Sequence, residues 1–414
     1  MDDQRDEQPP EVDEGRVAKP SRVEAASATA WVIRARQLRE PALRNACVLT
    51  FGFFVFAWRI AARLLDDFQQ GGDRWRQADW LVNGAVRRGA FGDVVLWVAD
   101  AADVAPVSLV ILAQAVLLGG FLLASYVAVA RLRFPSRLTL LALSPLFVGF
   151  WAWDTAGVGR KEILVYGAMG VLLAAPRSWA ALLFSGALFS VAAFAHEAML
   201  LFWPLFVAAL WVCHRRGAPR WAVLCASLGS LGLSLVALVS ASAFYGHGQP
   251  SQICAPLLAR GAPRTLCGGA IFFAGDSLAE AVAFTARSAR RGWPFTYVAY
   301  AAGSLGTFAA LWPTRASTRS AALVVGAGAL FAPLWWVAVD WGRWLNFHAT
   351  SITVLLMLSA QREGECAREL RPSAFWLALC VGLTWMVPHY VEAAPRWGPL
   401  GDAAAVFVAR LFRL

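Results

Sequence analysis

The chain has 414 residues, of which 58% are hydrophobic, and its formal net charge is +10. Apolar runs of about 16–24 residues recur along most of its length, and runs of this length are typical of helices that cross a membrane. This composition excludes a soluble enzyme, and the polar gaps are too short to hold a second domain. Arginine supplies nearly all of the positive charge. No basic patch is interleaved with aromatic residues, so we expect a lipid bilayer as partner and no nucleic acid.

We expect an all-α fold, a polytopic bundle of about eleven (10–12) transmembrane helices with short interfacial helices in the outer loops. Residues 1–45 are predicted to form a cytoplasmic tail that is disordered up to about residue 30 and then basic. The multi-span domain covers residues 46–388, and residues 389–414 form a C-terminal tail with an amphipathic end. The predicted spans are residues 46–65, 104–130, 138–153, 163–175, 180–195, 198–213, 221–244, 294–312, 320–339, 345–360 and 373–387.

Charge distribution predicts the orientation of the bundle. Four arginines between residues 34 and 44 precede the first span, which places the N-terminus in the cytoplasm by the positive-inside rule. The large outer loops are then residues 66–103 and 245–293, and most acidic residues fall on the outer side. Cys254 and Cys267 share the second loop and could form a disulfide if that loop is extracytoplasmic. No CxxC or His/Cys spacing predicts a metal site, and we expect no cofactor.

Three charged turns interrupt the apolar pattern on that outer side. Residues 154–162 and the pair His196-Glu197 each join two short predicted spans, and residues 340–348 join two more. A 16-residue helix rises only about 24 Å, whereas the hydrocarbon core is about 30 Å thick. The first two turns should therefore lie below the outer surface, where charged irregular backbone survives only if protein covers it or it lines a wet cavity. We predict a recessed pocket that opens outward.

The residues in these turns and in the first outer loop suit phosphate binding and acid–base chemistry. Arginine binds phosphate with two parallel hydrogen bonds, and a neighbouring carboxylate or imidazole can accept a hydroxyl proton. Ion pairs between helix ends, headgroup contacts and an aromatic belt are competing explanations, but four such motifs on one side favour a site. The candidate catalytic residues are Asp73, Glu162, His196, Glu197 and Asp340. The candidate substrate-binding residues are Arg87, Arg88, Asp154, Arg160, Lys161, Arg343, Trp341 and Trp344.

Four segments together resemble the EpsG/Wzy-type polysaccharide polymerases: Gly72-Asp73 with Trp80-Leu81-Val82-Asn83 and Val86-Arg87-Arg88-Gly89, then Arg160-Lys161-Glu162, then His196-Glu197-Ala198, then Asp340-Trp341-Gly342-Arg343. The resemblance implies a multi-span protein of the bacterial inner membrane. It implies transfer of a glycan from an undecaprenyl-diphosphate carrier to an acceptor sugar on the periplasmic face, alongside other envelope-polysaccharide machinery. Arginines would hold the diphosphate, first Arg160 and Arg343. The very large arginine-rich late loop of that family is absent or reduced to residues 245–293.

Two other functions stay open. A glycosyltransferase of the GT-C type would use a polyprenyl-phosphate sugar donor and a catalytic acid just after the first span, where Asp66, Asp67 and Asp73 lie. A transporter or flippase would use the recessed charges as an ion relay and should show pseudo-symmetric halves. We detect no internal repeat.

Overall fold

The computed structural model describes residues 22–154, 156–244, 248–292, 326–363, 369–392 and 396–412, together with residues 294–295, 298–299, 302–303 and 305–306. Nearly all the regular secondary structure of the described residues is helical, which confirms the all-α prediction. One short antiparallel pair is its only sheet, formed by β1 (Trp385–Met386) and β2 (Arg396–Trp397).

The helices in chain order are α1 (Arg22–Gln69), α2 (Gln77–Trp80), α3 (Gly89–Ala101), α4 (Pro106–Arg131), α5 (Ser136–Ala142), α6 (Val148–Trp153), α7 (Ile163–Ala174), α8 (Trp179–Ala195), η1 (Glu197–Phe202), α9 (Trp203–Arg215), α10 (Arg220–Ala243), α11 (Pro250–Ala259), η2 (Arg264–Cys267), η3 (Phe272–Gly275), α12 (Leu278–Arg291), α15 (Ala332–Val337), α16 (Trp341–Glu363), α17 (Pro372–Thr384) and α18 (Pro399–Phe412).

The described helices define a membrane protein. Four of them are long and apolar enough to cross a bilayer, namely Glu40–Gln69, Pro106–Arg131, Glu197–Arg215 and Arg220–Ala243. A fifth is added if Arg264–Gly275 and Leu278–Arg291, which meet at a bend of 111°, count as one span. Several shorter apolar helices accompany them. The count of eleven spans stays a prediction, and most of the predicted span over 294–312 lies outside the described residues.

Most predicted spans coincide with helices, and two differences have local causes. The predicted span over 138–153 is wrong in its middle, because the chain turns between α5 and α6. Pro145 has no N–H to donate there, and the Ser144 hydroxyl accepts the Leu146 N–H instead. Disorder up to residue 30 is also wrong in part, because α1 already begins at Arg22, within an alanine-rich stretch that favours helix.

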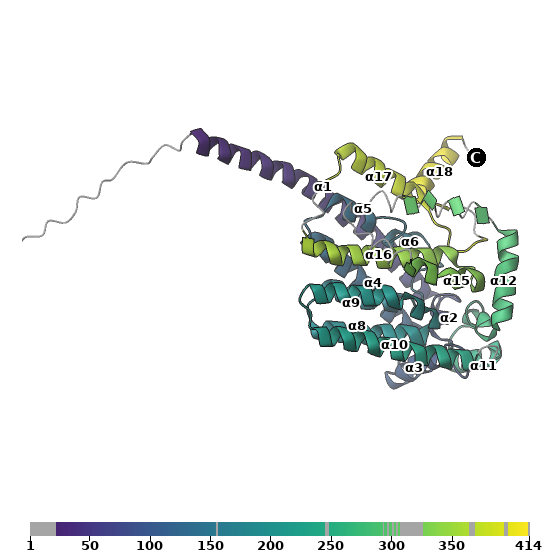
Figure 1. Ribbon diagram of the computed structural model, residues 1–414. Helices are drawn as coiled ribbons and strands as arrows, with labels where there is room; N and C mark the ends of the chain where they lie inside the picture. The colour runs from purple at the N-terminus through teal and green to yellow at the C-terminus, as the bar shows by residue number, and fades with distance from the viewer. Residues whose placement is uncertain are drawn as a thin grey trace, which may run out of the picture.

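The bundle has two unlike ends. In Figure 1, α16 lies beside α9 and α8 lies beside α10, and α12 stands across one end of these helices while the start of α1 projects from the other. Small residues permit the close packing of α8 against α10, because a Cβ added at Gly186 of α8 would lie 3.0 Å from the Ala226 backbone of α10. The end capped by α12 carries the charged turns.

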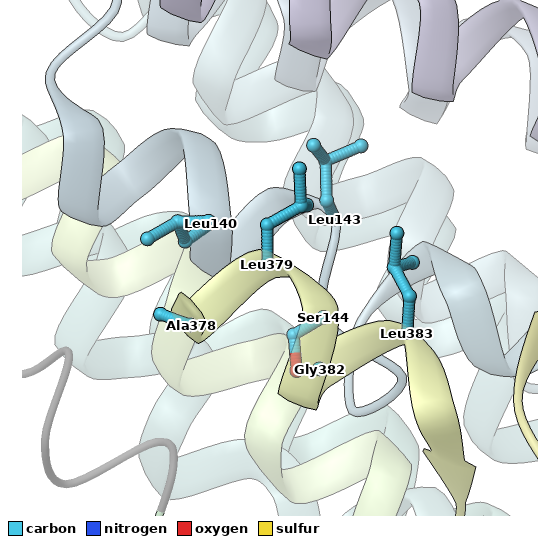
Figure 2. A pocket seen from close by; sticks show the side chains of 7 residues that line it. All are labelled: Leu140, Leu143, Ser144, Ala378, Leu379, Gly382 and Leu383. Carbon is cyan, nitrogen blue, oxygen red and sulfur yellow. The ribbon is translucent and has the colours of Figure 1, made fainter. Parts of the chain in front are cut away.

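A narrow crevice between α5 and α17 is a small gap in the packing of the two helices. Figure 2 shows leucine side chains of both helices, among them Leu140 and Leu379, around it. Its volume is about 10 Å³, which is room for one water at most. We assign it no ligand.

Candidate functional site

A cavity of about 620 Å³ lies at the end of the bundle that α12 crosses. This volume is in the range of small-molecule sites, which span about 300–1,000 Å³. Its lining comes from segments far apart in the sequence, including all four motifs that the sequence singles out. The charged and polar lining residues are Asp79, Arg87, Arg88, Arg160, His196, Glu197, Asp276, Thr285, Ser288, Asp340, Arg343, His389, Tyr390 and Glu392.

Glu197 forms one charged group in this cavity. Its carboxylate accepts two hydrogen bonds from Arg88, at 2.9 Å from Nε and 3.1 Å from Nη2. Arg87 Nη1 lies 3.7 Å from the same carboxylate. The preceding residue, His196, caps η1 by accepting the Ala198 N–H on Nδ1. The cap fixes the start of η1 and thereby holds Glu197 at the cavity.

Arg343 forms a second charged group with carboxylates from two elements. Its Nη2 lies 2.9 Å from Asp340 Oδ2 and 3.3 Å from Glu162 Oε1. Asp340 precedes α16 and Glu162 precedes α7, so the ion pairs join the ends of two helices. Asp340 faces the cavity, whereas Glu162 is buried behind Arg343.

His389 extends this group toward the charged turn that follows α6. Its Nδ1 bonds the carboxylate of Asp154 at 2.5 Å, and its Nε2 lies 3.3 Å from Asp340 Oδ1. Burial acts to lower the pKa of His389, but the two carboxylates overcome it and raise the pKa above the ordinary value. Burial likewise disfavours the Asp340 anion, yet Arg343 and His389 hold its pKa far below the ordinary value. Asp340 is therefore an anion over the whole physiological range.

Arg160 differs from the other arginines of the cavity. Its Nε donates to the carbonyl of Ala156 at 3.2 Å, and its guanidinium lies 5.6 Å from the centre of the Trp75 ring. Among the described residues, no carboxylate lies within ion-pair distance of it. Arg160 therefore presents to the cavity a positive charge that no carboxylate of the described residues pairs with, which suits an anionic ligand.

Apolar side chains make up much of the remaining lining of the cavity. Leu278, Ala281 and Phe284 lie on one face of α12, a spacing that follows the period of an α-helix. Leucines of η1 and α10 and the residues around the end of α15 complete this wall. They are Leu200, Leu201, Leu238, Leu334, Val337, Ala338 and Val339. A charged part and an apolar part in one cavity favour an amphipathic ligand.

Lys161 lies behind the charged part and is fully buried. Among the described residues its Nζ has no hydrogen-bond partner, and it lies 5.3 Å from the centre of the Phe91 ring. Burial lowers the pKa of Lys161 to about 8, although Asp79 acts to raise it. The charge of this amine therefore changes near physiological pH.

Buried hydrogen bonds hold the first outer loop against the turn that carries Arg160. The carbonyl of Gly159 accepts from Trp80 Nε1 at 2.8 Å and from Gln114 Nε2 at 2.6 Å. Gln77 in turn donates to Gln114 at 2.7 Å. These hydrogen bonds join α2, α4 and the turn at the Gly159 carbonyl. They therefore fix the positions of Arg160 and Asp79 relative to each other.

A disulfide joins Cys254 and Cys267, which the sequence left conditional on the location of the loop. It links α11 to η2, directly before Ala270, Phe273 and Ala274, which line the cavity. The Phe273 ring stacks on Trp75 with centroids 5.7 Å apart. The crosslink therefore restrains the segment that forms one wall.

The structure brings most of the predicted site residues to this cavity and gives the others supporting contacts. Lining it are Arg87, Arg88, Arg160, His196, Glu197, Asp340, Arg343 and Trp344. Glu162, Asp154 and Lys161 lie buried beside the lining groups. Asp73 accepts the N–H groups of Trp75 and Arg76 at the start of α2. Trp341 donates from its indole to the carbonyl of Trp335.

Sequence reasoning missed several residues of the cavity. Among them are Asp79 and Asp276, which none of the four motifs contains. His389, Tyr390 and Glu392 fell in the predicted tail, beyond the last span. The rarity of histidine, with five in the chain, was the only signal for His389.

No protein-family model, curated protein or solved structure matches the chain. The function is therefore argued from the cavity and its residues.

Proposed function

We propose that the protein is a membrane glycosyltransferase of the polysaccharide-polymerase kind. It moves a glycan from a polyprenyl-diphosphate carrier to a hydroxyl of an acceptor sugar. In this proposal the chain crosses the bacterial inner membrane about eleven times, the N-terminus is cytoplasmic and the cavity faces the periplasm. The observation that carries the proposal is the cavity itself, which both charged and apolar residues line and in which Arg160 has no ion-pair partner among the described residues.

The two parts of the cavity match the two parts of such a donor. Arg160 binds the diphosphate, supported by Arg343 and Arg88, and the positive charges stabilise the diphosphate as it leaves. The first isoprene units of the carrier lie along α12, where Phe284 and Leu278 cover them. Trp75 and Trp344 line the cavity, and aromatic side chains pack well against the apolar faces of sugar rings.

The reaction is a substitution at the anomeric carbon. The acceptor hydroxyl forms a bond to that carbon, and the bond from the carbon to the diphosphate oxygen breaks with its electron pair. Polyprenyl diphosphate leaves and takes up no proton. As the new bond forms, the hydroxyl proton becomes acidic, so a weakly basic carboxylate can accept it late.

Asp340 is the group that we assign to this proton. Its carboxylate is a permanent anion, lines the cavity and is 19% exposed. His196 is less suitable, because burial and the charge of Arg88 lower its pKa and its Nδ1 already accepts a hydrogen bond. Asp67, an acid expected of a GT-C enzyme, is buried against Arg76 instead.

Binding of farnesyl diphosphate, a short lipid diphosphate, tests the proposal. We expect the purified protein in nanodiscs to bind it, and Arg160→Gln to weaken binding about ten- to a hundred-fold, the value of a charged hydrogen bond. Arg260→Gln is the matched control, because Arg260 pairs with Asp100 on the exposed surface. Equal affinity of wild type and Arg160→Gln contradicts the proposal.

A further inference from the structure

The segment that carries His389 is fixed directly onto the start of α16. The carbonyl of His389 accepts the N–H of Gly342 at 3.0 Å, and the N–H of Val391 donates to Val339 at 3.0 Å. These two bonds flank Asp340. A Cβ added at Gly342 would lie 1.8 Å from the carbonyl oxygen of Pro388, so only glycine permits this approach. The first residues of the predicted C-terminal tail, His389, Tyr390 and Glu392, therefore line the cavity.

Asp154 fixes the imidazole from the other side. Its carboxylate holds Nδ1, and the ring of Phe150 is nearly parallel to the imidazole, at 16° and 6.3 Å between centroids. Gly157 makes room for the pair, because a Cβ there would lie 2.2 Å from Asp154 Oδ2 and 3.1 Å from His389 Nδ1. With the ring held in this way, Nε2 can only point toward Asp340.

The contact between Nε2 and Asp340 is an ion pair rather than an aligned hydrogen bond. Nε2 is buried, and among the described residues its nearest anion is Asp340 Oδ1 at 3.3 Å. The other oxygen of the Asp340 carboxylate, Oδ2, forms an ion pair with Arg343. Asp340 is thus held by a cation at each oxygen, with one face left toward the cavity.

The groups around His389 favour its protonated form. Asp154 and Asp340 face it directly, and the phenol of Tyr390 adjoins it on its own segment. Glu392 follows on that segment, and Arg343 and Arg160 lie beyond Asp340. The two carboxylates in contact with the imidazole affect its protonation more strongly than these more distant charges do. A doubly protonated His389 gives Asp340 a fixed partner and cannot itself act as the base.

We propose that His389 is a positioning residue: with Asp154 behind it, it fixes the Asp340 carboxylate at the cavity surface in the orientation that meets the acceptor hydroxyl. The inference rests on the proposed function, because it assigns the surroundings of the same proton acceptor. It predicts that loss of His389 or Asp154 slows transfer while leaving Arg160 free to bind the diphosphate. A misplacement of about 1 Å at such a group can lower the rate by about 100-fold.

Nitrogen NMR of the protein labelled with ¹⁵N-histidine tests the positioning without any activity. The chain has five histidines, so a single variant, His389→Gln, identifies the signal. We expect both ring nitrogens of His389 to be protonated at pH 7.5, and Asp154→Asn to shift the ring toward its neutral form. A neutral His389 in the wild type, or a signal that Asp154→Asn leaves unchanged, overturns the proposal. Asp154→Asn retains the imidazole, so it serves where His389→Gln does not fold.

Kinetics then separate positioning from general damage to the fold. With a polyprenyl-diphosphate-linked oligosaccharide as donor, we expect His389→Gln to lower kcat about 100-fold while Kd for farnesyl diphosphate stays within about twofold. Asp154→Asn should do the same, and the double variant should be no slower. A parallel loss of affinity and rate overturns the proposal. If the wild type transfers nothing while the NMR result holds, the proposed function fails and the arrangement of His389 stands.

Discussion

The guanidinium of Arg88 donates two hydrogen bonds to the carboxylate of Glu197, although the two residues are 109 positions apart in the chain. Arg88 adopts φ +69°, in the left-handed region. A residue with a Cβ pays about 1–2 kcal/mol for this conformation, so the surrounding contacts must fix it. The ion pair supplies such a contact, and it connects the first outer loop to the hairpin of α8 and η1.

Breaking this pair should strongly destabilise the fold. Glu197→Gln leaves Arg88 and Arg87 partly buried beside a neutral side chain, and loss of one partner of a buried pair costs about 3–5 kcal/mol. We expect a lower thermal unfolding midpoint in detergent, followed by tryptophan fluorescence. The double variant Arg88→Gln with Glu197→Gln should lose less than the sum of the single variants. Strictly additive losses would show that the two side chains do not interact energetically.

The apolar wall should recognise the lipid part of the ligand. Phe284→Ser removes a ring from the cavity face of α12, and burial of such a side chain is worth about 1.5–3 kcal/mol. We expect affinity for farnesyl diphosphate to fall about tenfold or more and affinity for inorganic pyrophosphate to stay constant, both measured by calorimetry. Val282→Ser, on an exposed position of the same helix, is the control. Equal effects on both ligands would place the isoprenoid chain elsewhere.

Lys161 should make the free energy of unfolding depend on pH above neutrality. The unfolded chain holds this proton up to about pH 10.5, and burial makes the folded chain release it near pH 8. Between these values the unfolded state binds more protons, so the wild type gains stability as the pH rises, by about 3 kcal/mol in total. The variant Lys161→Met lacks this gain. Unfolding midpoints of both proteins from pH 7 to 10.5 measure it, and parallel curves would contradict it.

The disulfide should report which side of the membrane the cavity faces. If the loop is extracytoplasmic, Cys254 and Cys267 are oxidised in cells, and a maleimide labels them only after reduction. Replacement of both by serine should weaken farnesyl diphosphate binding, because the crosslink precedes the wall formed by Phe273 and Ala274. Labelling without reductant would contradict the predicted orientation.

Much of this arrangement could be predicted because charges are costly in an apolar chain. Arg160, Glu197 and Asp340 stand out against hydrophobic runs, and the short helices around them imply a recessed site. The apolar wall could not be found in this way, since Phe284 and Leu238 look like any lipid-facing residues. His389 was missed because its role depends on backbone contacts with Gly342, which no local pattern reveals. The interruption between α5 and α6 had a local signal in Pro145, outweighed by the surrounding apolar residues.

The glycan profile of the source organism tests the central claim most directly. We predict that a strain without the gene accumulates single repeat units on the lipid carrier and loses long chains. Wild type and Arg260→Gln should restore the long chains, and Arg160→Gln should not. Long chains that persist without the gene would contradict the claim, and loss of a single side-branch sugar would instead indicate a transferase that uses a polyprenyl-phosphate sugar.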